Sequence, residues 1–297
     1  MKRVLKWIGY LAATLVVLIL VAVGTVYAVS SSRMSKTYTP KVAALAIPSD
    51  SASIARGRHL VETVGKCQGC HGDNYAGEPM FEGAMFANLT TANITAGQGG
   101  IGSVYNETDW VRAIRHGVGR DGKTLLFMPS KGYTHFNDND LAQMIAYLRT
   151  LPPANAPAPR KRSIGPIART LSLVAGFPLY SASYVPENME RPVIPEGPTV
   201  EYGRYLIETG VCAECHGDNL AGSTRGPAPT PNITHGGEMG KWTQADFVKV
   251  IRTGVRPDGR TISTVMPWQL MKRLTDVELA AMWAYLQSLP AVRSSPQ

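Results

Sequence analysis

The motif Cys-x-x-Cys-His occurs twice, at residues 67–71 and 212–216, and uses every cysteine of this 297-residue chain. This spacing is the attachment signature of c-type haem. The two thiols form thioethers with the haem vinyl groups, and the adjacent histidine binds the iron. Two motifs with no cysteine left over predict two covalently attached haem c groups, held by Cys67, Cys70 and His71 and by Cys212, Cys215 and His216.

Other chemistries use the same residue types. A thioredoxin-like redox site contains Cys-x-x-Cys but does not require the following histidine. A zinc site with four thiolate ligands would use all four cysteines. However, the two pairs lie about 145 residues apart, and His-Gly-Asp-Asn follows each pair. The repeated histidine favours haem, and zinc or disulfides remain the alternatives.

The second axial ligand of each iron decides between electron transfer and chemistry at the metal. A Met-Pro pair occurs at matched places in the two halves, at Met128 and Met266. A thioether is a soft ligand, and His/Met ligation raises the reduction potential. We therefore predict no catalytic residue and four iron ligands, which are His71, Met128, His216 and Met266. Less favoured ligands are Met80, Met85, Met239, Met271, His59, His116, His135 and His235.

The two motifs belong to an internal duplication. Residues 57–63 match 203–209, and residues 141–152 match 279–290. A repeated unit of about 100 residues has the size of a domain, and two copies make a tandem pair rather than a solenoid. The expected organisation is a membrane anchor over 1–36, a first haem domain over 37–152, a linker over 153–199 and a second haem domain over 200–297.

Each half is expected to be mainly α, with short helices and loops around a haem. The first helices are expected over about 54–63 and 200–209, the middle helices from near Thr108 and Thr243, and the last helices from Asn137 and Thr275. Gly57 and Gly203 would let the first helix approach the last one closely. The segments between the helices are rich in Gly, Pro and Asn, show no convincing strand pattern and are expected to wrap the haem.

Two further groups recur in both halves. Asn93 and Asn232 each begin an Asn-Ile-Thr sequence before the middle helix. Hydrogen bonds to haem propionates and simple turn chemistry explain this sequence equally well. Arg115 and Arg252 match on the middle helices, where pairing with a propionate or an acid competes with solvation, the slightly favoured interpretation.

Residues 7–29 form one apolar run without charge, preceded by Lys2, Arg3 and Lys6. At about 1.5 Å per residue, a helix of this length crosses a hydrocarbon core of about 30 Å. The preceding positive charges favour a cytoplasmic N-terminus and export of the remainder. The length of the run favours a retained single-pass anchor over a cleaved signal peptide. Either interpretation places the haem domains in an extracytoplasmic or periplasmic location.

The net charge of +8 is concentrated outside the haem segments. Residues 1–36 contain five Lys or Arg and no acid, whereas residues 37–151 contain ten of each sign. Residues 201–297 contain ten basic and nine acidic residues. A nucleic-acid-binding domain needs a clustered basic face. The distribution instead indicates a topology signal and a basic linker, so no nucleic-acid partner is predicted.

The linker combines two kinds of sequence. Residues 152–160 are rich in proline and predict a stiff, extended spacer. Residues 164–180 are too apolar for a free linker, yet too short, with Arg169 among them, for a second membrane span. The favoured hypothesis is that residues 164–180 pack between the two haem domains and fix their geometry. An interfacial helix and a docking site for a partner are the alternatives.

These motifs resemble those of class I c-type cytochromes, specifically tandem di-haem members. Over roughly 50–151 and 198–290 the chain is similar to the cytochrome c subunits of membrane-bound bacterial alcohol, aldehyde and gluconate dehydrogenases. The shared features include Asp258-Gly259-Arg260, both Asn-Ile-Thr sequences and residues 284–290. The resemblance implies the same ligand roles for the eight residues of the two haem sites. Those subunits usually carry three haem domains, whereas this chain carries two and a long inserted linker.

The sequence therefore predicts an electron-transfer protein rather than an enzyme. We expect a membrane-anchored di-haem cytochrome c that passes single electrons from a respiratory, photosynthetic or dehydrogenase donor to a protein acceptor. The first alternative is a cytochrome subunit of a membrane dehydrogenase complex. The second is a di-haem redox enzyme, such as a peroxidase or a thiosulfate-oxidising protein, with one open haem.

Overall fold

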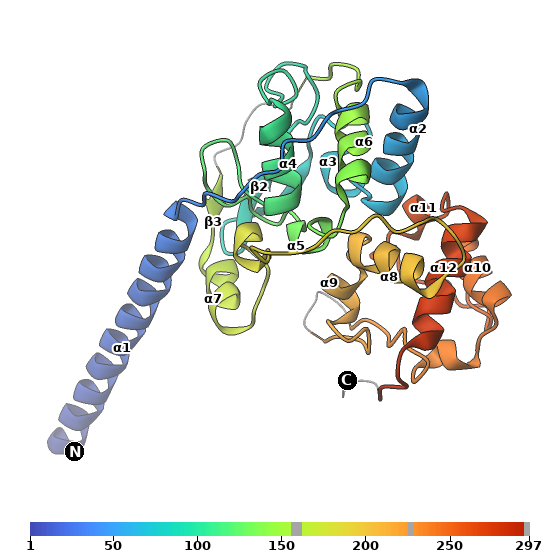
Figure 1. Cartoon of the computed structure of the whole chain (residues 1–297). Coiled ribbons are helices and arrows are strands. Elements are labelled where there is room, and N and C mark those ends of the chain that lie inside the picture. The colour runs from blue at the N-terminus through green and yellow to red at the C-terminus, as the bar shows by residue number, and fades with distance from the viewer. Residues whose placement is uncertain (156–161, 225–228, 294–297) are drawn as a thin grey trace.

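The computed structural model describes residues 1–155, 162–224 and 229–293. The protein is mainly helical, as the sequence predicts. A long N-terminal helix leads into two helical units that lie side by side (Figure 1). Most of the predicted proline-rich spacer, at residues 156–161, lies outside the described residues.

Helix α1, Lys2–Ser35, projects away from the two helical units (Figure 1). Within the described ranges it is the one helix long and apolar enough to cross a membrane. Its side chains are exposed along almost the whole length, and Ser30 is the one fully buried residue in it. An apolar helix that is exposed over most of its length gains from a lipid environment, because water solvates its surface poorly.

The first unit contains six helical segments that surround the first cysteine motif. These are α2 (Ser51–His59), the π-helical turn η1 (Leu60–Val64), α3 (Gln68–His71), α4 (Glu107–His116), α5 (Ser130–Tyr133) and α6 (Asp138–Leu148). The expected helix over 54–63 is thus α2 continued by a π-helical turn. Asn106 forms a capping box with Asp109, so α4 begins one residue before the expected Thr108. Asn137 caps α6, as predicted.

The second unit repeats this order of helices. It contains α8 (Val200–Thr209), α9 (Cys212–His216), the 3₁₀ turn η3 (Glu238–Lys241), α10 (Gln244–Thr253), α11 (Trp268–Met271) and α12 (Asp276–Ser288). Helix α8 has the predicted bounds. Thr243 and Thr275 each cap the following helix in a capping box, which confirms both predicted starts.

Glycine sets the distance between the first and last helix of each unit. A Cβ atom on Gly57 would lie 1.9 Å from the backbone oxygen of Gln143 in α6. A Cβ atom on Gly203 would lie 1.9 Å from the backbone oxygen of Ala281 in α12. Both distances are far below van der Waals contact, so only glycine permits the approach. The predicted close helix pairs are confirmed in both units.

The expectation that the segments between the helices lack strands is wrong for the first unit. Strands β1 (Pro79–Gly83) and β2 (Ala87–Thr90) form an antiparallel hairpin, and β3 (Ser163–Ile164) from the linker pairs antiparallel with β2. The pattern is hard to recognise because the strands are short and the register shifts between Pro79 and Phe81. Aromatic packing stabilises the hairpin, since the Phe81 and Phe127 ring centroids are 4.8 Å apart.

The apolar part of the linker does not pack between the two units as predicted. It forms α7 (Pro166–Val174) and the 3₁₀ turn η2 (Ser181–Tyr184), which lie against α1 and the first unit. Ile164, Ala168 and Tyr180 form a small apolar cluster with residues of the hairpin. Two sets of contacts fix the position of this linker segment. Strand β3 pairs with β2, and Arg169 donates hydrogen bonds to Ser30 and Ser31 in α1.

The two units meet through equivalent surfaces. The first helix of each unit contacts the start of the last helix in the other. His59 donates a hydrogen bond to the Glu278 carboxylate at 2.8 Å, and the Tyr205 hydroxyl donates to the Asp140 carboxylate at 2.5 Å. In the internal repeat, His59 corresponds to Tyr205 and Asp140 corresponds to Glu278. The contact is therefore close to two-fold symmetric.

Candidate haem sites

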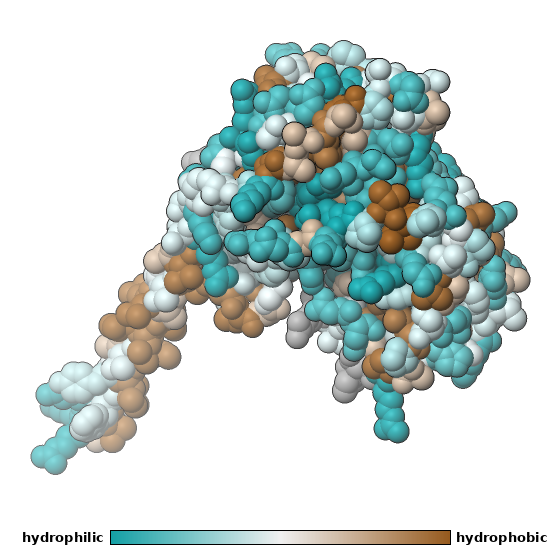
Figure 2. Space-filling view, viewed as in Figure 1, coloured by the Kyte–Doolittle hydropathy of each residue, from teal (hydrophilic) through white to brown (hydrophobic). Residues whose placement is uncertain are grey.

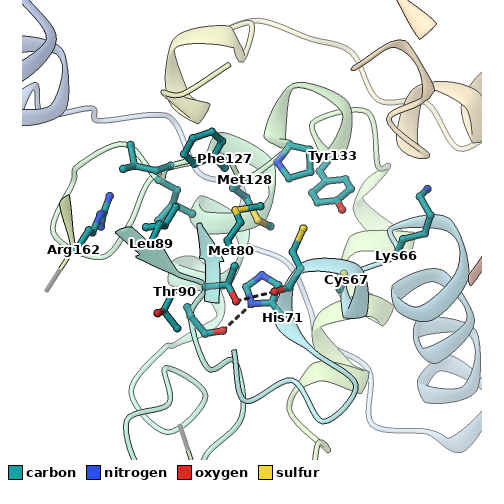
Figure 3. A pocket seen from close by; sticks show the side chains of 16 residues that line it. Lys66, Cys67, His71, Met80, Leu89, Thr90, Phe127, Met128, Tyr133 and Arg162 are labelled. Atoms are coloured by element: carbon teal, nitrogen blue, oxygen red, sulfur yellow. Dashed lines mark hydrogen bonds between the residues drawn. The ribbon is translucent and has the colours of Figure 1, made fainter. Parts of the chain in front are cut away.

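A cavity of about 210 Å³ lies beside the first cysteine motif. Cys67, Cys70 and His71 line it together with Met128, which reaches the cavity from the segment before α5. Met128 lies across the cavity from the His71 ring (Figure 3). The structure thus brings together the four residues that the sequence predicts for the first site.

Both motif histidines are held in the same way. His71 Nδ1 lies 2.7 Å from the backbone oxygen of Ala92, and His216 Nδ1 lies 2.8 Å from that of Pro231. A carbonyl oxygen only accepts, so each Nδ1 carries the proton and each Nε2 keeps a free lone pair. Burial lowers the pKa of His71 and of His216, and the carbonyl hydrogen bond opposes this shift only in part. Both rings are therefore neutral near pH 7, as iron ligation requires.

The backbone around the motif is also the same in both units. Lys66 and Val211, which precede the first cysteine of each motif, adopt left-handed conformations with φ of 52° and 54°. Such conformations cost energy for residues other than glycine and occur often at functional sites. The Thr91 hydroxyl donates to the Cys70 backbone oxygen at 2.7 Å, and the Thr230 hydroxyl donates to that of Cys215 at 2.6 Å. The sequence repeat therefore encodes one rigid turn, built twice.

The groups at the cavity fit haem c. A His/Met c-type haem needs two neighbouring thiols, an imidazole with a free Nε2 and a thioether on the opposite side. The cavity offers these groups at Cys67, Cys70, His71 and Met128. Leu89 and Phe127 add apolar walls, and Arg162 adds a cationic group. Met266 of the second unit packs against the main core, as Met128 of the first unit does. The prolines that follow them have almost the same backbone angles, with φ of −79° and ψ of 49° and 46°.

The zinc alternative finds no support in the geometry. Over residues 1–155, 162–224 and 229–293, no group of three or more Cys, His, Asp or Glu is arranged to hold a metal ion. Zinc binds thiolates, yet burial raises the pKa of all four thiols, that of Cys67 to about 12.

The less favoured ligands lie mostly elsewhere. His59, His135 and His235 bond to side chains of Glu278, Glu208 and Gln287 respectively. Burial lowers the pKa of His116 to about 4, and this residue does not line the cavity. Met85 is exposed, whereas Met239 and Met271 are buried in the core.

Met80 is the exception among these residues. It extends from β1 into the cavity, where it lies near Met128 (Figure 3). The hairpin that carries it was not expected, so the sequence reasoning placed Met80 in a loop.

The recurring Asn-Ile-Thr sequences have the geometry of turns. Asn93 Oδ1 accepts hydrogen bonds from the backbone and hydroxyl groups of Thr95, and its amide donates to the Ala154 backbone oxygen at 2.7 Å. Asn232 makes the same bonds with Thr234 and with the backbone oxygen of Val292. These bonds support turn chemistry over propionate binding.

Arg115 is not solvated as favoured from the sequence. Its side chain is 2% exposed and lies 2.7 Å from Asp138 at the start of α6. Arg252 makes the matching ion pair with Asp276, also at 2.7 Å. The acid-pairing alternative is therefore correct at both positions, with the guanidinium buried at Arg115 and partly exposed at Arg252.

Lys66 also lines the cavity, although no sequence motif marks it as a site residue. Its partly buried ammonium group donates to the backbone oxygens of Val64 at 2.7 Å and of Gly210 at 2.9 Å. Gly210 belongs to the second unit and lies two residues before Cys212, so Lys66 joins the two cysteine motifs. The available signal was the mismatch in the repeat, in which a charged residue replaces the apolar Val211.

Comparisons with known proteins agree with this geometry. A family model described as cytochrome c matches residues 200–290. A second, described as cytochrome c oxidase, cbb3-type, subunit III, matches residues 52–148. The chain is 30% identical over 217 residues to a diheme cytochrome c-type protein of Cereibacter sphaeroides, with 65% of this chain and 68% of that protein covered. The chain belongs to the c-type cytochrome family, whose members bind haem c covalently.

Cytochrome subunits of dehydrogenases are also similar. The chain is 27% identical over 280 residues to the gluconate 2-dehydrogenase cytochrome c subunit of Pantoea cypripedii, with 83% of this chain and 62% of the relative covered. It is 26% identical over 280 residues to the cytochrome c subunit of alcohol dehydrogenase (quinone) of Komagataeibacter europaeus, with 83% and 58% covered. The chain therefore spans about three fifths of the length of these two relatives. The predicted resemblance to membrane dehydrogenase cytochromes is confirmed.

Proposed function

We propose that this protein is a membrane-anchored di-haem cytochrome c that transfers single electrons between a donor and a protein acceptor. Its two haem units correspond to residues 37–152 and 200–297. His71 and Met128 would hold the haem iron in the first unit, and His216 and Met266 would hold it in the second. Cys67, Cys70, Cys212 and Cys215 form the thioethers. Haem c, when bound, supplies a one-electron iron couple.

One observation carries this proposal: the chain offers a neutral histidine and a methionine on opposite sides of the cavity beside the first motif. The repeat provides the same groups in the same local backbone in the second unit. With a histidine and a thioether both holding the iron, a substrate would find no open position. The Ala92 and Pro231 carbonyls hold the imidazoles, and the prolines after the methionines stiffen the ligand segments.

The arrangement of the two units supports transfer within the chain. Lys66 bonds across to Gly210, and a Cβ atom on Gly69 in the first motif would lie 3.5 Å from Leu270 of the second unit. The two attachment segments therefore belong to one packed interface. Ion pairs also cross the interface, among them the exposed Arg273 with the buried Glu62 at 2.8 Å.

Helix α1 supports the membrane location. We infer that it is a single-pass anchor with a cytoplasmic N-terminus and periplasmic haem units. Lys2, Arg3 and Lys6 precede the apolar run, and positive charge is retained on the cytoplasmic side. Periplasmic haem units would meet redox partners at the membrane surface.

The test is a potentiometric titration of the full-length protein in detergent, with spectra of the reduced form with and without carbon monoxide. We expect two relatively high potentials and no spectral change with carbon monoxide. Met128→Ala and Met266→Ala are matched variants, and each is expected to make one haem reactive toward carbon monoxide. A carbon monoxide shift in the unmodified protein would reveal an open position and favour a di-haem peroxidase or a thiosulfate-oxidising enzyme.

A second candidate is a cytochrome subunit of a membrane dehydrogenase complex. The similarity to the gluconate and alcohol dehydrogenase cytochrome subunits favours it. The partner would then be a catalytic subunit that delivers electrons from substrate oxidation. Affinity purification from gently solubilised native membranes tests this candidate. Stoichiometric co-purification of a flavin- or quinone-containing dehydrogenase supports it, whereas recovery of the cytochrome alone contradicts it.

A further inference from the structure

Helix α7 buries polar side chains and exposes apolar ones. Its buried residues are Ala168, Arg169 and Ser172, which are 0%, 8% and 3% exposed. Two of its large apolar residues face outward, since Ile167 is 45% and Val174 is 76% exposed, whereas Leu171 and Leu173 are half-buried. A helix on the surface of a water-soluble protein buries its apolar stripe and exposes its polar one. The orientation of α7 is the opposite, which suits a surface in contact with an apolar medium.

The inverted orientation is fixed by contacts with the anchor. Arg169 donates to the Ser30 hydroxyl at 3.0 Å and to the Ser31 hydroxyl at 3.1 Å. Its guanidinium group also lies 4.6 Å from the centre of the Tyr27 ring. Tyr180 bonds to Ser30 from the other end of the apolar linker segment. Rotation of α7 that buried its apolar face would break this network and leave a buried cation unpaired.

The contacts place α7 at a defined depth along α1. Tyr27, Ser30 and Ser31 lie where the uncharged run of α1 ends, just before Arg33 and Lys36. The boundary between hydrocarbon and headgroups is expected there. Figure 2 shows an apolar patch at the position of α7, beside the apolar surface of α1. The exposed face of α7 is thus continuous with the membrane-spanning surface.

The neighbouring hairpin extends the apolar surface. The Met85 backbone oxygen accepts from the Ile167 amide at 3.0 Å, and Met85 itself is 61% exposed. Contiguous exposed apolar residues of this kind mark an interaction site.

The local charge suits the surface of a phospholipid membrane. No Asp or Glu occurs between Asp140 and Glu187, or before Asp50. Arg33, Lys36 and Arg162 lie in these acid-free segments. Basic residues beside apolar ones are typical of interfacial helices, because the headgroups of bacterial membranes are partly anionic.

We propose that the exposed face of α7, formed by Ile167 and Val174 with the half-buried Leu171 beside them, inserts together with Met85 into the outer leaflet beside α1. The occupant of this surface is the phospholipid boundary between headgroups and acyl chains. The first haem unit is then held at two points, α1 and α7, and cannot pivot freely about the anchor. This inference rests on the proposed membrane anchor but is separately testable.

The test is a spin-label experiment on the full-length holoprotein in vesicles of phosphatidylethanolamine and phosphatidylglycerol. All native cysteines are consumed by haem attachment, so an added cysteine is the sole free thiol. Val174→Cys reports on α7. Leu15→Cys in the middle of α1 reports on the hydrocarbon, and Val104→Cys, in the exposed loop before α4, reports on water. Power saturation compares collisions with oxygen, which concentrates in lipid, and with a water-soluble nickel chelate.

We expect the oxygen-to-nickel collision ratio at position 174 to be several-fold above that at position 104 and below that at position 15. If the ratio at position 174 equals that at position 104 while position 15 lies in lipid, the proposed insertion of α7 is wrong and the membrane anchor stands. A water-like ratio at position 15 would overturn both the membrane anchor and the insertion of α7. Protection of 174 only after a purified dehydrogenase partner is added also overturns the lipid assignment, in favour of a protein contact.

Discussion

The close helix pairs give the sharpest quantitative prediction, because the two units provide it twice. Gly57→Ala and Gly203→Ala each place a methyl group 1.9 Å from a backbone oxygen of the facing helix. A carbon and a carbonyl oxygen normally stay about 3.3 Å apart. Each helix pair must therefore separate by roughly 1.4 Å, and the obstacle is backbone that no rotamer change can move.

The free-energy cost follows from two opposing effects. Overpacking costs about 3 kcal/mol when the surroundings cannot yield, whereas Ala gains about 1 kcal/mol over Gly in a helix interior. The net destabilisation of unfolding is about 2 kcal/mol per substitution, which is a factor of about 30 in the folding equilibrium. The two variants should behave alike, because their surroundings are equivalent.

Denaturant unfolding of the haem-loaded protein in detergent, followed by circular dichroism and haem absorbance, measures this loss. Gly83→Ala is the control, since an added Cβ there meets no atom within 4 Å. It should unfold within about 0.5 kcal/mol of the unmodified protein. Unchanged or increased stability of Gly57→Ala would show that the helices separate without cost, and the steric argument would be refuted.

Three further predictions concern charged residues. Burial raises the pKa of Glu278, but hydrogen bonds from His59 and Thr275 outweigh it, so the folded pKa lies below the unfolded one. The ionised Glu278 therefore stabilises the interface above about pH 4.5, and this stabilisation is lost as pH falls through the folded pKa. Glu278→Gln should flatten the pH dependence of the free energy of unfolding below about pH 5. Lys66→Met removes a partly buried cation beside both motifs and should lower both reduction potentials in a spectroelectrochemical titration, with Lys66→Arg retaining them. Arg169→Ala should cost about 2–3 kcal/mol of local stability. The loss is expected to appear as faster cleavage by chymotrypsin within α7, after Leu173, in detergent, and an unchanged cleavage rate would contradict the role of Arg169.

Local signals account for what the sequence predicted well. The motif spacing predicted haem c attachment, which membership of the c-type cytochrome family supports, and side-chain caps at Thr243 and Thr275 located helix starts to the residue. Gly57 and Gly203 were recognisable as contact points because they recur at one position of the repeat. These features depend on neighbours within a few residues or on the comparison of the two halves.

Long-range contacts account for what the sequence did not predict. Strand β3 is two residues long and pairs with a strand more than seventy residues earlier, so no local pattern marks it. The apolar composition of 164–180 suggested burial between the two units, whereas Arg169 and its partners in α1 turn the apolar face outward. The bridging role of Lys66 depends on Gly210 of the other unit, and a single sequence gives no measure of that proximity.

The near two-fold contact between the units has an evolutionary consequence. His59 with Glu278 and Tyr205 with Asp140 are the same pair of repeat positions, used once in each direction. A surface that binds its own copy in this way is an isologous interface, the kind that forms C2 homodimers. An ancestral single-haem protein that already dimerised through this surface would keep the interface when its gene was duplicated and joined. Fusion then made the pairing independent of protein concentration and allowed the two copies to diverge. Lys66 shows this divergence, because the equivalent position of the second unit holds the aliphatic Val211.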